Sequence, residues 1–211
     1  MNAGPYWLLL PCLFLGAVAP ARATELETRT IVFFGDSLTA GYGLAEPSTE
    51  AYPSLIQKKI EEAHLPYRVV NAGLSGETTA GGLRRIDWIL RQPVDIFVLA
   101  LGANDGLRGI RPDVSRQNLE QILQRVRAKS PQATLIVAGM QMPREMGADF
   151  AAAFGKIFSA VAQKYDAKFV PFLLEGVGGR PEFNQGDQIH PNPDGHAILA
   201  ENVWKVLRPL L

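Results

Sequence analysis

Residues 31–38 read Ile-Val-Phe-Phe-Gly-Asp-Ser-Leu, a short apolar run that ends in a glycine, an acid and a serine. The run 31–34 predicts a buried strand, and Gly35 permits a sharp turn at its end. Ser37 then follows the carboxyl end of the strand, where parallel-sheet proteins bind their ligands. Two interpretations are open at this point. Ser37 either caps the next helix or carries a nucleophilic hydroxyl.

Outward from this stretch, strand-like and helix-like segments alternate along the chain. Further strands are expected at residues 68–71, 96–101, 133–139 and 168–172. Helices are expected from near 53, over 79–90 and 114–129, around 150–161, and from near 193. The run 96–101 is continuously apolar, which is typical of a strand covered on both faces, while Pro171 favours a sheet edge for the last strand. The alternation predicts an α/β domain with a parallel sheet and right-handed crossovers.

The first 23 residues differ from the rest. Tyr6 to Ala19 is almost wholly apolar and uncharged, and Ala21-Arg22-Ala23 fits a small-x-small cleavage site. The apolar stretch is too short to span a bilayer, so it predicts a secretory signal peptide over residues 1–23 and a periplasmic or secreted protein. One feature departs from this pattern, because residues 1–5 contain no Lys or Arg. Residues 24–211 are expected to form a single domain.

Composition excludes several classes of function. The chain has 21 Lys and Arg against 21 Asp and Glu, so no strong field attracts nucleic acid or an anionic membrane surface. The one cysteine, Cys12, lies in the predicted signal peptide, which leaves no disulfide framework and no cysteine nucleophile. No later segment is long enough to span a membrane, so stable membrane insertion is not expected. A monomer is expected, because no exposed apolar stripe is evident.

Three predicted strands end in polar turns that contain glycine, at residues 35–37, 73–76 and 102–105. These ends share one edge of a parallel sheet, so Ser37, the amide of Gly76 and the side chain of Asn104 can converge there. A fourth segment carries Asp187 and His190 before the last helix. An acid and a histidine three residues apart can meet across one turn, which leaves the other ring nitrogen for a serine.

Each of these segments also has a simpler interpretation. Asn104-Asp105-Gly106 is a good turn sequence without any function. His190 precedes Pro191-Asn192-Pro193 and can simply close a turn before a helix. The other two histidines, His64 and His196, are expected to be surface or packing residues.

Several other motifs are absent or incomplete. Ser75 lies in Gly-Leu-Ser-Gly-Glu (residues 73–77), which begins like the nucleophile elbow G-x-S-x-G but lacks its last glycine. No phosphate-binding loop is present, and no cofactor is expected. The residues Asp187, His190, Asp194 and His196 match no standard metal-ligand spacing, so no metal site is expected.

Taken together, Gly35-Asp36-Ser37-Leu38, the Gly76 turn, Gly102-Ala103-Asn104-Asp105 and Asp187-Gln188-Ile189-His190 resemble the four sequence blocks of the GDSL, or SGNH, hydrolases. The likeness is greatest to the periplasmic thioesterase, lysophospholipase and arylesterase branch. It covers essentially all of residues 24–211, in order. The resemblance implies a flavodoxin-like three-layer α/β/α sandwich with five parallel strands.

The resemblance also implies roles for individual residues. Ser37 matches the nucleophile, and Asp187 and His190 match the acid and the base. The amides of Ser37 and Gly76 and the Asn104 side chain match the oxyanion donors, with Gly73 as a rival for the glycine.

The expected function is that of a serine esterase, which cleaves carboxylic esters and thioesters through an acyl-serine. Candidate substrates are acyl and aryl esters, acyl-CoA and lysophospholipids. The alternatives are a carbohydrate O-deacetylase and a catalytically inactive lipid- or flavin-binding module. A Met-rich segment, residues 140–146, and the aromatic residues Phe150 and Phe154 favour an apolar acyl group. The natural substrate, the preferred chain length and the role of Asp36 stay open.

Overall fold

The computed structural model describes residues 1, 4 and 27–211. The predicted signal peptide therefore lies outside the described residues, apart from Met1 and Gly4. Among the described residues, no helix is both long enough and apolar enough to cross a membrane.

Five parallel strands form one sheet in the order β2-β1-β3-β4-β5. Their bounds are β1 (Arg29–Gly35), β2 (Tyr67–Gly73), β3 (Ile96–Ala100), β4 (Thr134–Ala138) and β5 (Lys168–Val170). The chain runs from β1 to one side and then returns to place β3 on the other side, so the strand order reverses between β1 and β3. Ligand sites in open α/β sheets lie outside the carboxyl ends of the strands at such a reversal. The predicted parallel sheet is confirmed.

The last strand lies at an edge of the sheet, as Pro171 predicts, but it ends at Val170 and not at Phe172. Proline has no backbone N–H to donate to a neighbouring strand, so the ladder stops before it.

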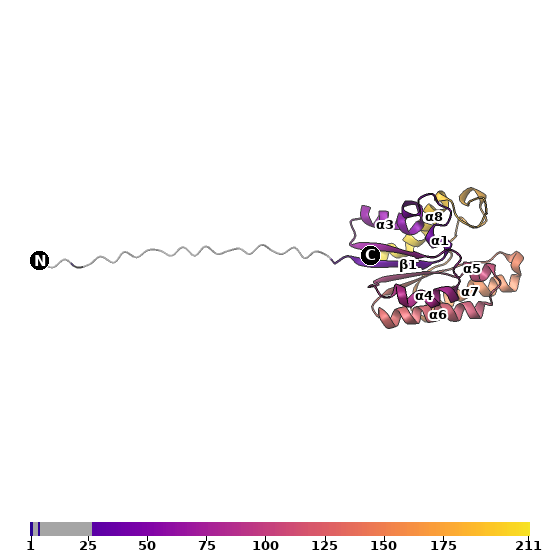
Figure 1. Cartoon of the computed structure of the whole chain (residues 1–211), viewed down its shortest axis with the longest axis horizontal. Helices are drawn as coiled ribbons and strands as arrows, with labels where there is room; N and C mark the ends of the chain where they lie inside the picture. The colour runs from indigo at the N-terminus through magenta and orange to yellow at the C-terminus, as the bar shows by residue number, and fades with distance from the viewer. Residues whose placement is uncertain (2–3, 5–26) are drawn as a thin grey trace.

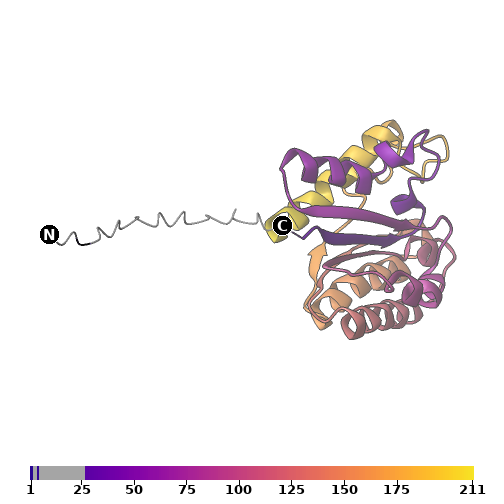
Figure 2. The same cartoon turned by 60° about the vertical axis from the view of Figure 1, so that its left-hand side comes forward.

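Helices cover both faces of the sheet (Figures 1 and 2). One layer contains α3 (Tyr52–Glu62) and α8 (Pro193–Leu207), which pack against each other. The opposite layer contains α4 (Thr79–Ile89), α6 (Pro112–Lys129) and α7 (Ala148–Lys164). Within that layer α6 contacts both of its neighbours. The predicted three-layer α/β/α sandwich is confirmed.

Several short helices were not predicted. They are α1 (Ser37–Ala40), α2 (Pro47–Glu50), α5 (Ala103–Leu107) and the 3-10 turns η1 (Arg144–Met146), η2 (Pro181–Phe183) and η3 (Arg208–Leu210). Segments of three to five residues are too short to show a helical period in the sequence. The turn interpretation of residues 104–106 is therefore wrong, because these residues belong to α5.

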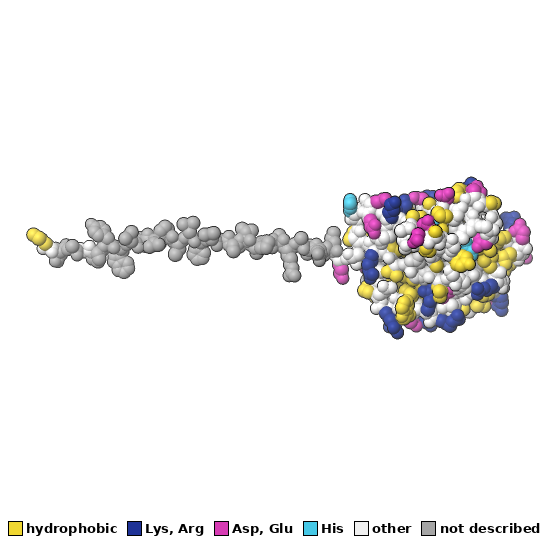
Figure 3. Space-filling model, turned by 45° about the horizontal axis from the view of Figure 1, so that its top comes forward, with side chains coloured by type: hydrophobic (Ala, Val, Ile, Leu, Met, Phe, Trp, Pro, Cys, Tyr) yellow, Lys and Arg dark blue, Asp and Glu magenta, His cyan; other side chains and the backbone are white. Residues whose placement is uncertain are grey.

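The two strands at the reversal, β1 and β3, are the most enclosed part of the molecule. The side chains of residues 31–34 are all fully buried, and those of β3 are nearly so. This explains why both strands are uniformly apolar. On the surface, basic and acidic side chains are interspersed over the face shown in Figure 3, in keeping with the balanced composition.

Candidate active site

Ser37 is the first residue of α1, directly after β1. The side chain of Asp36 caps this helix, since its Oδ1 accepts a hydrogen bond from the Leu38 amide at 3.1 Å. The turn is tightly packed. A Cβ atom on Gly35 would lie 1.9 Å from Thr39 Oγ1 and 2.8 Å from the Ala100 carbonyl oxygen. Ser37 retains 9% exposure. Its position at the end of a central strand is therefore fixed by packing around the glycine and by a cap within the turn.

Three side chains from the two ends of the chain meet at this point. His190 Nε2 lies 3.0 Å from Ser37 Oγ, and His190 Nδ1 lies 2.6 Å from Asp187 Oδ2. In the tautomer protonated on Nδ1, the imidazole donates to the carboxylate and accepts the serine proton. The three residues that the sequence singled out are thus joined in one line of hydrogen bonds.

The Asp187 carboxylate also organises its own loop. Its Oδ1 accepts hydrogen bonds from the backbone amides of Ile189 at 2.9 Å and His190 at 3.0 Å. The bond with the His190 side chain, followed by these two amide bonds, lowers the pKa of Asp187 to about 2. Between the acid and the base, Gln188 adopts a left-handed backbone conformation with φ of +60°. The carboxylate is therefore ionised at neutral pH and fixed in orientation.

Besides the Ser37 amide, the predicted oxyanion donors lie in two adjoining segments, the turn that contains Gly76 and the start of α5. Residues 74–77 form a turn closed by the Glu77 amide, which donates to the Leu74 carbonyl at 3.1 Å, and Gly76 has φ of +78°. The Asn104 side chain, at the start of α5, donates through Nδ2 to the Glu77 carbonyl at 3.1 Å. An amide NH2 carries two donors, so the second can donate to an oxygen beside Ser37. Asn104 is thereby oriented by the turn that contains Gly76.

A buried carboxylate, Asp105, holds α5 in place next to the turn that contains Gly76. Asp105 is fully buried and accepts hydrogen bonds from the Thr79 amide at 2.8 Å and from the Ser115 hydroxyl at 3.0 Å. It therefore connects α5, which carries Asn104, to the start of α4 and to α6. Glu77, in the neighbouring turn, is buried and forms an ion pair with the partly exposed Arg85. Sequence patterns did not identify these supporting contacts, because they depend on which turns face each other.

Asp36 has an unusual environment for an acid. It is buried, and its Oδ2 has no hydrogen-bond partner among the described residues. Burial raises the pKa of Asp36, the hydrogen bond from the Leu38 amide lowers it, and the nearby carboxylates Asp105 and Glu77 add to the rise, so the pKa is about 7. The second residue of the GDSL block thus differs from Asp187 in both burial and charge state.

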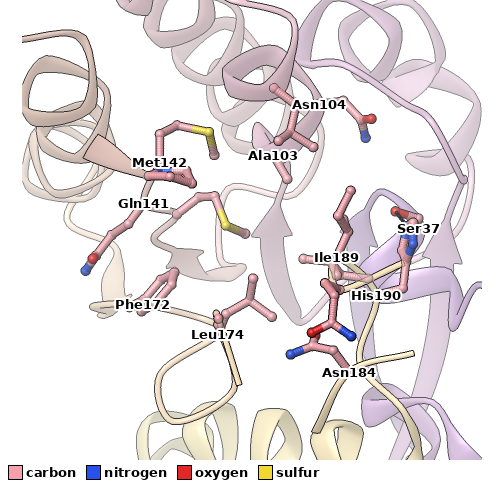
Figure 4. Close-up of a pocket in the computed structure, with 17 residues that line it drawn as sticks. Ser37, Ala103, Asn104, Gln141, Met142, Phe172, Leu174, Asn184, Ile189 and His190 are labelled. Atoms are coloured by element: carbon pink, nitrogen blue, oxygen red, sulfur yellow. Dashed lines mark hydrogen bonds between the residues drawn. The ribbon is translucent and has the colours of Figure 1, made fainter. Parts of the chain in front are cut away.

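A cavity of about 560 Å³ opens beside the serine. Its lining includes Ser37, Asn104 and His190, whereas Gly76 and Asp187 lie outside the lining. In Figure 4, Ser37 and His190 lie side by side, and Met142, Phe172 and Leu174 lie on the other side of the cavity. The wall is mostly apolar, and the volume falls in the range of ligand-binding pockets.

The sequence predicted only part of this wall. Met140 and Met142 line the cavity, but Met146 does not. The expectation that Phe150 and Phe154 would favour an acyl group at the site is not supported: Phe154 is fully buried, Phe150 stacks on it at 5.8 Å, and neither lines the cavity. Helical spacing identifies a buried face but not what it faces.

Three further lining residues, Phe172, Leu174 and Ile189, were not singled out from the sequence. Their positions in the sequence could have indicated this role, because Phe172 and Leu174 follow β5 and Ile189 directly precedes the predicted base His190.

The residues considered as alternatives lie elsewhere. Ser75 is exposed and does not line the cavity. His196 is buried, and its Nδ1 accepts a hydrogen bond from the Tyr52 amide at 3.2 Å. Burial lowers the pKa of His196 to about 4, so its ring is neutral and structural. Within residues 27–211, no group of three or more His, Cys, Asp or Glu side chains is arranged to hold a metal ion.

Comparison with known proteins identifies the family. Residues 33–198 match the model of the GDSL-like lipase/acylhydrolase family. The chain is 39% identical to esterase TesA of Pseudomonas aeruginosa, over 97% of this chain and 98% of that protein. It is 37% identical to thioesterase 1/protease 1/lysophospholipase L1 of Escherichia coli K12, over 96% and 93% of the two chains.

A solved structure is also similar. The SGNH-hydrolase family esterase AlinE4 is 39% identical and superimposes with a TM-score of 0.72, covering 89% of this chain and 99% of that one. A family match over most of the sequence, near full-length relatives and a shared fold all agree. The chain belongs to the GDSL-like lipase/acylhydrolase family.

Proposed function

We propose that this protein is a serine esterase in which Ser37 is the nucleophile, His190 the general base and Asp187 the residue that orients the base. The observation that carries the proposal is the line of hydrogen bonds from Asp187 through His190 to Ser37, which ends at a mostly apolar cavity. A serine hydroxyl is a weak nucleophile until an adjacent base takes its proton.

In the first half of the reaction, Ser37 Oγ attacks the ester carbonyl while His190 Nε2 takes its proton. The tetrahedral intermediate collapses, the alcohol or thiol leaves with the proton from His190, and an acyl-serine remains. In the second half, His190 removes a proton from water, which attacks the acyl-serine and releases the carboxylic acid. Asp187 keeps the imidazole in the tautomer that accepts the serine proton and stabilises the imidazolium that forms.

The oxyanion of each tetrahedral intermediate would be stabilised by the amides of Ser37 and Gly76 and by the Asn104 side chain. Preorganised donors of this kind typically contribute about 10²–10³-fold each to the rate. The hydrogen bond from Asn104 to the Glu77 carbonyl supports this assignment, because it holds the side-chain amide before substrate arrives.

The substrate is proposed to be an ester or thioester with an apolar acyl chain. Met140, Met142, Phe172 and Leu174 form a wall that suits hydrocarbon better than a sugar ring. The names of the relatives, an esterase and a thioesterase/lysophospholipase, support both ester and thioester substrates. The same apolar wall speaks against the alternative function, a carbohydrate O-deacetylase.

Residues 1–23 are proposed to be a signal peptide that directs export to the periplasm or beyond, on the grounds of the apolar stretch and the Ala21-Arg22-Ala23 site. Residues 24–211 would then act as a single-domain monomer.

The test is hydrolysis of nitrophenyl esters of increasing chain length by the wild-type protein and by Ser37→Ala. The value of kcat/KM should rise from acetyl to longer chains until the cavity is filled, since each buried CH2 contributes about 0.8 kcal/mol. Ser37→Ala should lose at least about 10³-fold in kcat.

Ser75→Ala is the matched control and should keep wild-type turnover. Wild-type turnover by folded Ser37→Ala would contradict the mechanism, and higher activity on acetylated sugars than on any acyl ester would contradict the substrate class.

A further inference from the structure

The side chain of Gln185 connects the loop of the histidine to the loop that follows the serine. Its Nε2 donates to the carbonyl of Tyr42 at 2.7 Å and to the carbonyl of Pro191 at 2.9 Å. The backbone amide of Gln185 also donates to the His190 carbonyl at 2.7 Å. A single residue therefore bonds to the chain on both sides of the serine–histidine contact.

The neighbouring glycine leaves room for this side chain. A Cβ atom on Gly43 would lie 2.0 Å from Gln185 Oε1, and Gly43 has φ of +78°. Any larger residue at 43 would push the amide away from the Tyr42 carbonyl. Both loops therefore contribute to the contact between Gln185 and Tyr42, one with the glutamine side chain and the other with a glycine that leaves space for it.

Tyr42 makes the second half of the connection. Its amide donates to the Ser37 carbonyl at 3.1 Å, and its ring packs against the imidazole of His190 with the centroids 4.7 Å apart. The residue is nevertheless 53% exposed. Its hydroxyl has no hydrogen-bond partner among the described residues. The packing of the ring, and not the hydroxyl, is therefore the contact available to the histidine.

We propose that Tyr42 and Gln185 form a clamp that positions the His190 imidazole against Ser37 Oγ; this rests on the esterase function proposed above. Gln185 sets the distance between the two loops, and the Tyr42 ring restricts rotation of the imidazole. Neither side chain lines the cavity, so neither is expected to contact the acyl group. They are positioning residues, which act on the reaction through His190.

This role predicts a particular kinetic pattern. When a catalytic group is displaced by about 1 Å, the chemical step slows by up to about 10²-fold, although binding of the substrate is unchanged. Loss of the clamp should therefore lower kcat and leave KM unaltered. A residue that merely holds the loop for stability would instead lower the midpoint of unfolding without this separation of kcat from KM.

The experiment compares Gln185→Met and Tyr42→Ala with Tyr42→Phe, which keeps the ring and removes the hydroxyl. The first two should lose about 10- to 100-fold in kcat on a nitrophenyl ester, with KM within about twofold of wild type, and the labelling of Ser37 by a fluorophosphonate should slow in proportion. Tyr42→Phe should retain wild-type kcat. The double variant should lose less than the product of the single losses, because both act on one contact.

Gln124→Ala, at an exposed position of α6, controls for the loss of a glutamine side chain and should not change kcat. The proposal is overturned if folded Gln185→Met and Tyr42→Ala keep wild-type kcat, if KM rises while kcat holds, or if Tyr42→Phe loses as much as Tyr42→Ala. A wild-type protein that neither hydrolyses esters nor reacts with a fluorophosphonate would instead contradict the esterase function, so the two failures are distinguishable.

Discussion

Ser37 lies in a packed turn, whereas His190 lies in a loop whose middle residues are exposed. The serine turn, residues 35–40, contains side chains with little or no exposure and has no room for a Cβ atom at Gly35. The histidine loop, residues 184–191, is buried at its two ends and exposed over residues 186–189, and a Cβ atom on Gly186 would meet nothing within 4 Å. Its shape is held by the Asp187 carboxylate, which accepts the His190 amide, and by the Gln185 side chain, which donates to the Tyr42 carbonyl.

The two regions therefore fix their catalytic groups by different means. The hydrophobic core determines where the serine lies, and a small number of polar contacts determine where the imidazole lies. Apart from the nucleophile Ser37 itself, substitutions in the serine turn should be detected mainly as changes in stability. Substitutions in the histidine loop should be detected mainly as changes in turnover by a protein that remains folded.

The largest effect is expected for Asp187→Asn in the histidine loop. The asparagine oxygen can still accept the amides of Ile189 and His190, but its NH2 group faces Nδ1 and favours the wrong tautomer of His190. We expect kcat to fall by about 10³–10⁴-fold, measured by nitrophenyl ester hydrolysis. The free energy of unfolding at neutral pH, measured by urea denaturation, should fall only slightly, since the charge-assisted bonds of the partly exposed carboxylate become neutral ones. A variant that keeps more than a tenth of wild-type kcat would show that the carboxylate does not orient the base.

The acid of the serine turn should affect stability through pH. The pKa of Asp36 is raised by burial to about 7, so the folded state holds a proton that the unfolded state releases above about pH 4. Stability contributed by this group is present at low pH and falls as pH rises from about 4 to about 7, by on the order of 4 kcal/mol.

Asp36→Asn should lack this part of the decline, which urea denaturation at several pH values would measure. Equal slopes for the two proteins between pH 4 and 7 would contradict the raised pKa. The contribution of Asp187 to stability depends on pH in the opposite direction. Because its pKa is lowered, its contribution is present at neutral pH and is lost as pH falls from about 4 to about 2.

A pair of glycine substitutions tests the packing difference directly. Gly35→Ala places a methyl group against Thr39 and the Ala100 carbonyl, and should lower the free energy of unfolding by about 2 kcal/mol. Gly186→Ala, in the histidine loop, should change it by less than about 0.5 kcal/mol, because the added Cβ points into open space. Similar losses for both variants would remove the distinction between the two regions.

The smallest effect concerns strain in the histidine loop. Gln188 has φ of +60°, a conformation that glycine adopts without steric cost, and its Nε2 donates to the Gln185 carbonyl at 3.2 Å. Gln188→Gly should stabilise the protein by about 0.5 kcal/mol, since relief of strain exceeds the added entropy of the unfolded chain and the lost bond. Asp166→Gly, at φ of +49° outside the site, is the matched comparison. A loss of stability confined to Gln188→Gly would show that its side-chain contact outweighs the strain.

Much of the fold could be predicted from particular residues. The uniform apolar runs at 31–34 and 96–101 predicted strands buried on both faces, and these are β1 and β3 at the centre of the sheet. Parallel strands deliver their carboxyl ends to one edge, which is why Ser37 and Asn104 could be placed together before the structure was known. The short helices could not be predicted, because they span too few residues to show a period.

The contacts that orient the site were beyond such reasoning. The bond from Gln185 to Tyr42 joins residues 143 positions apart through the conformation of two loops. The spacing of residues within either loop does not predict that the two loops come together. Similarly, the spacing of Phe150 and Phe154 indicated a buried face, but only packing decides whether such a face meets the core or a cavity.

The most direct test is to map the site of covalent reaction with a fluorophosphonate. The account predicts one modified residue, Ser37, in a peptide identified by mass spectrometry, with labelling abolished in Ser37→Ala and retained in Ser75→Ala. Modification of Ser75, or no modification of the folded wild-type protein, would contradict the claim that the histidine loop activates Ser37 of the serine turn as the nucleophile.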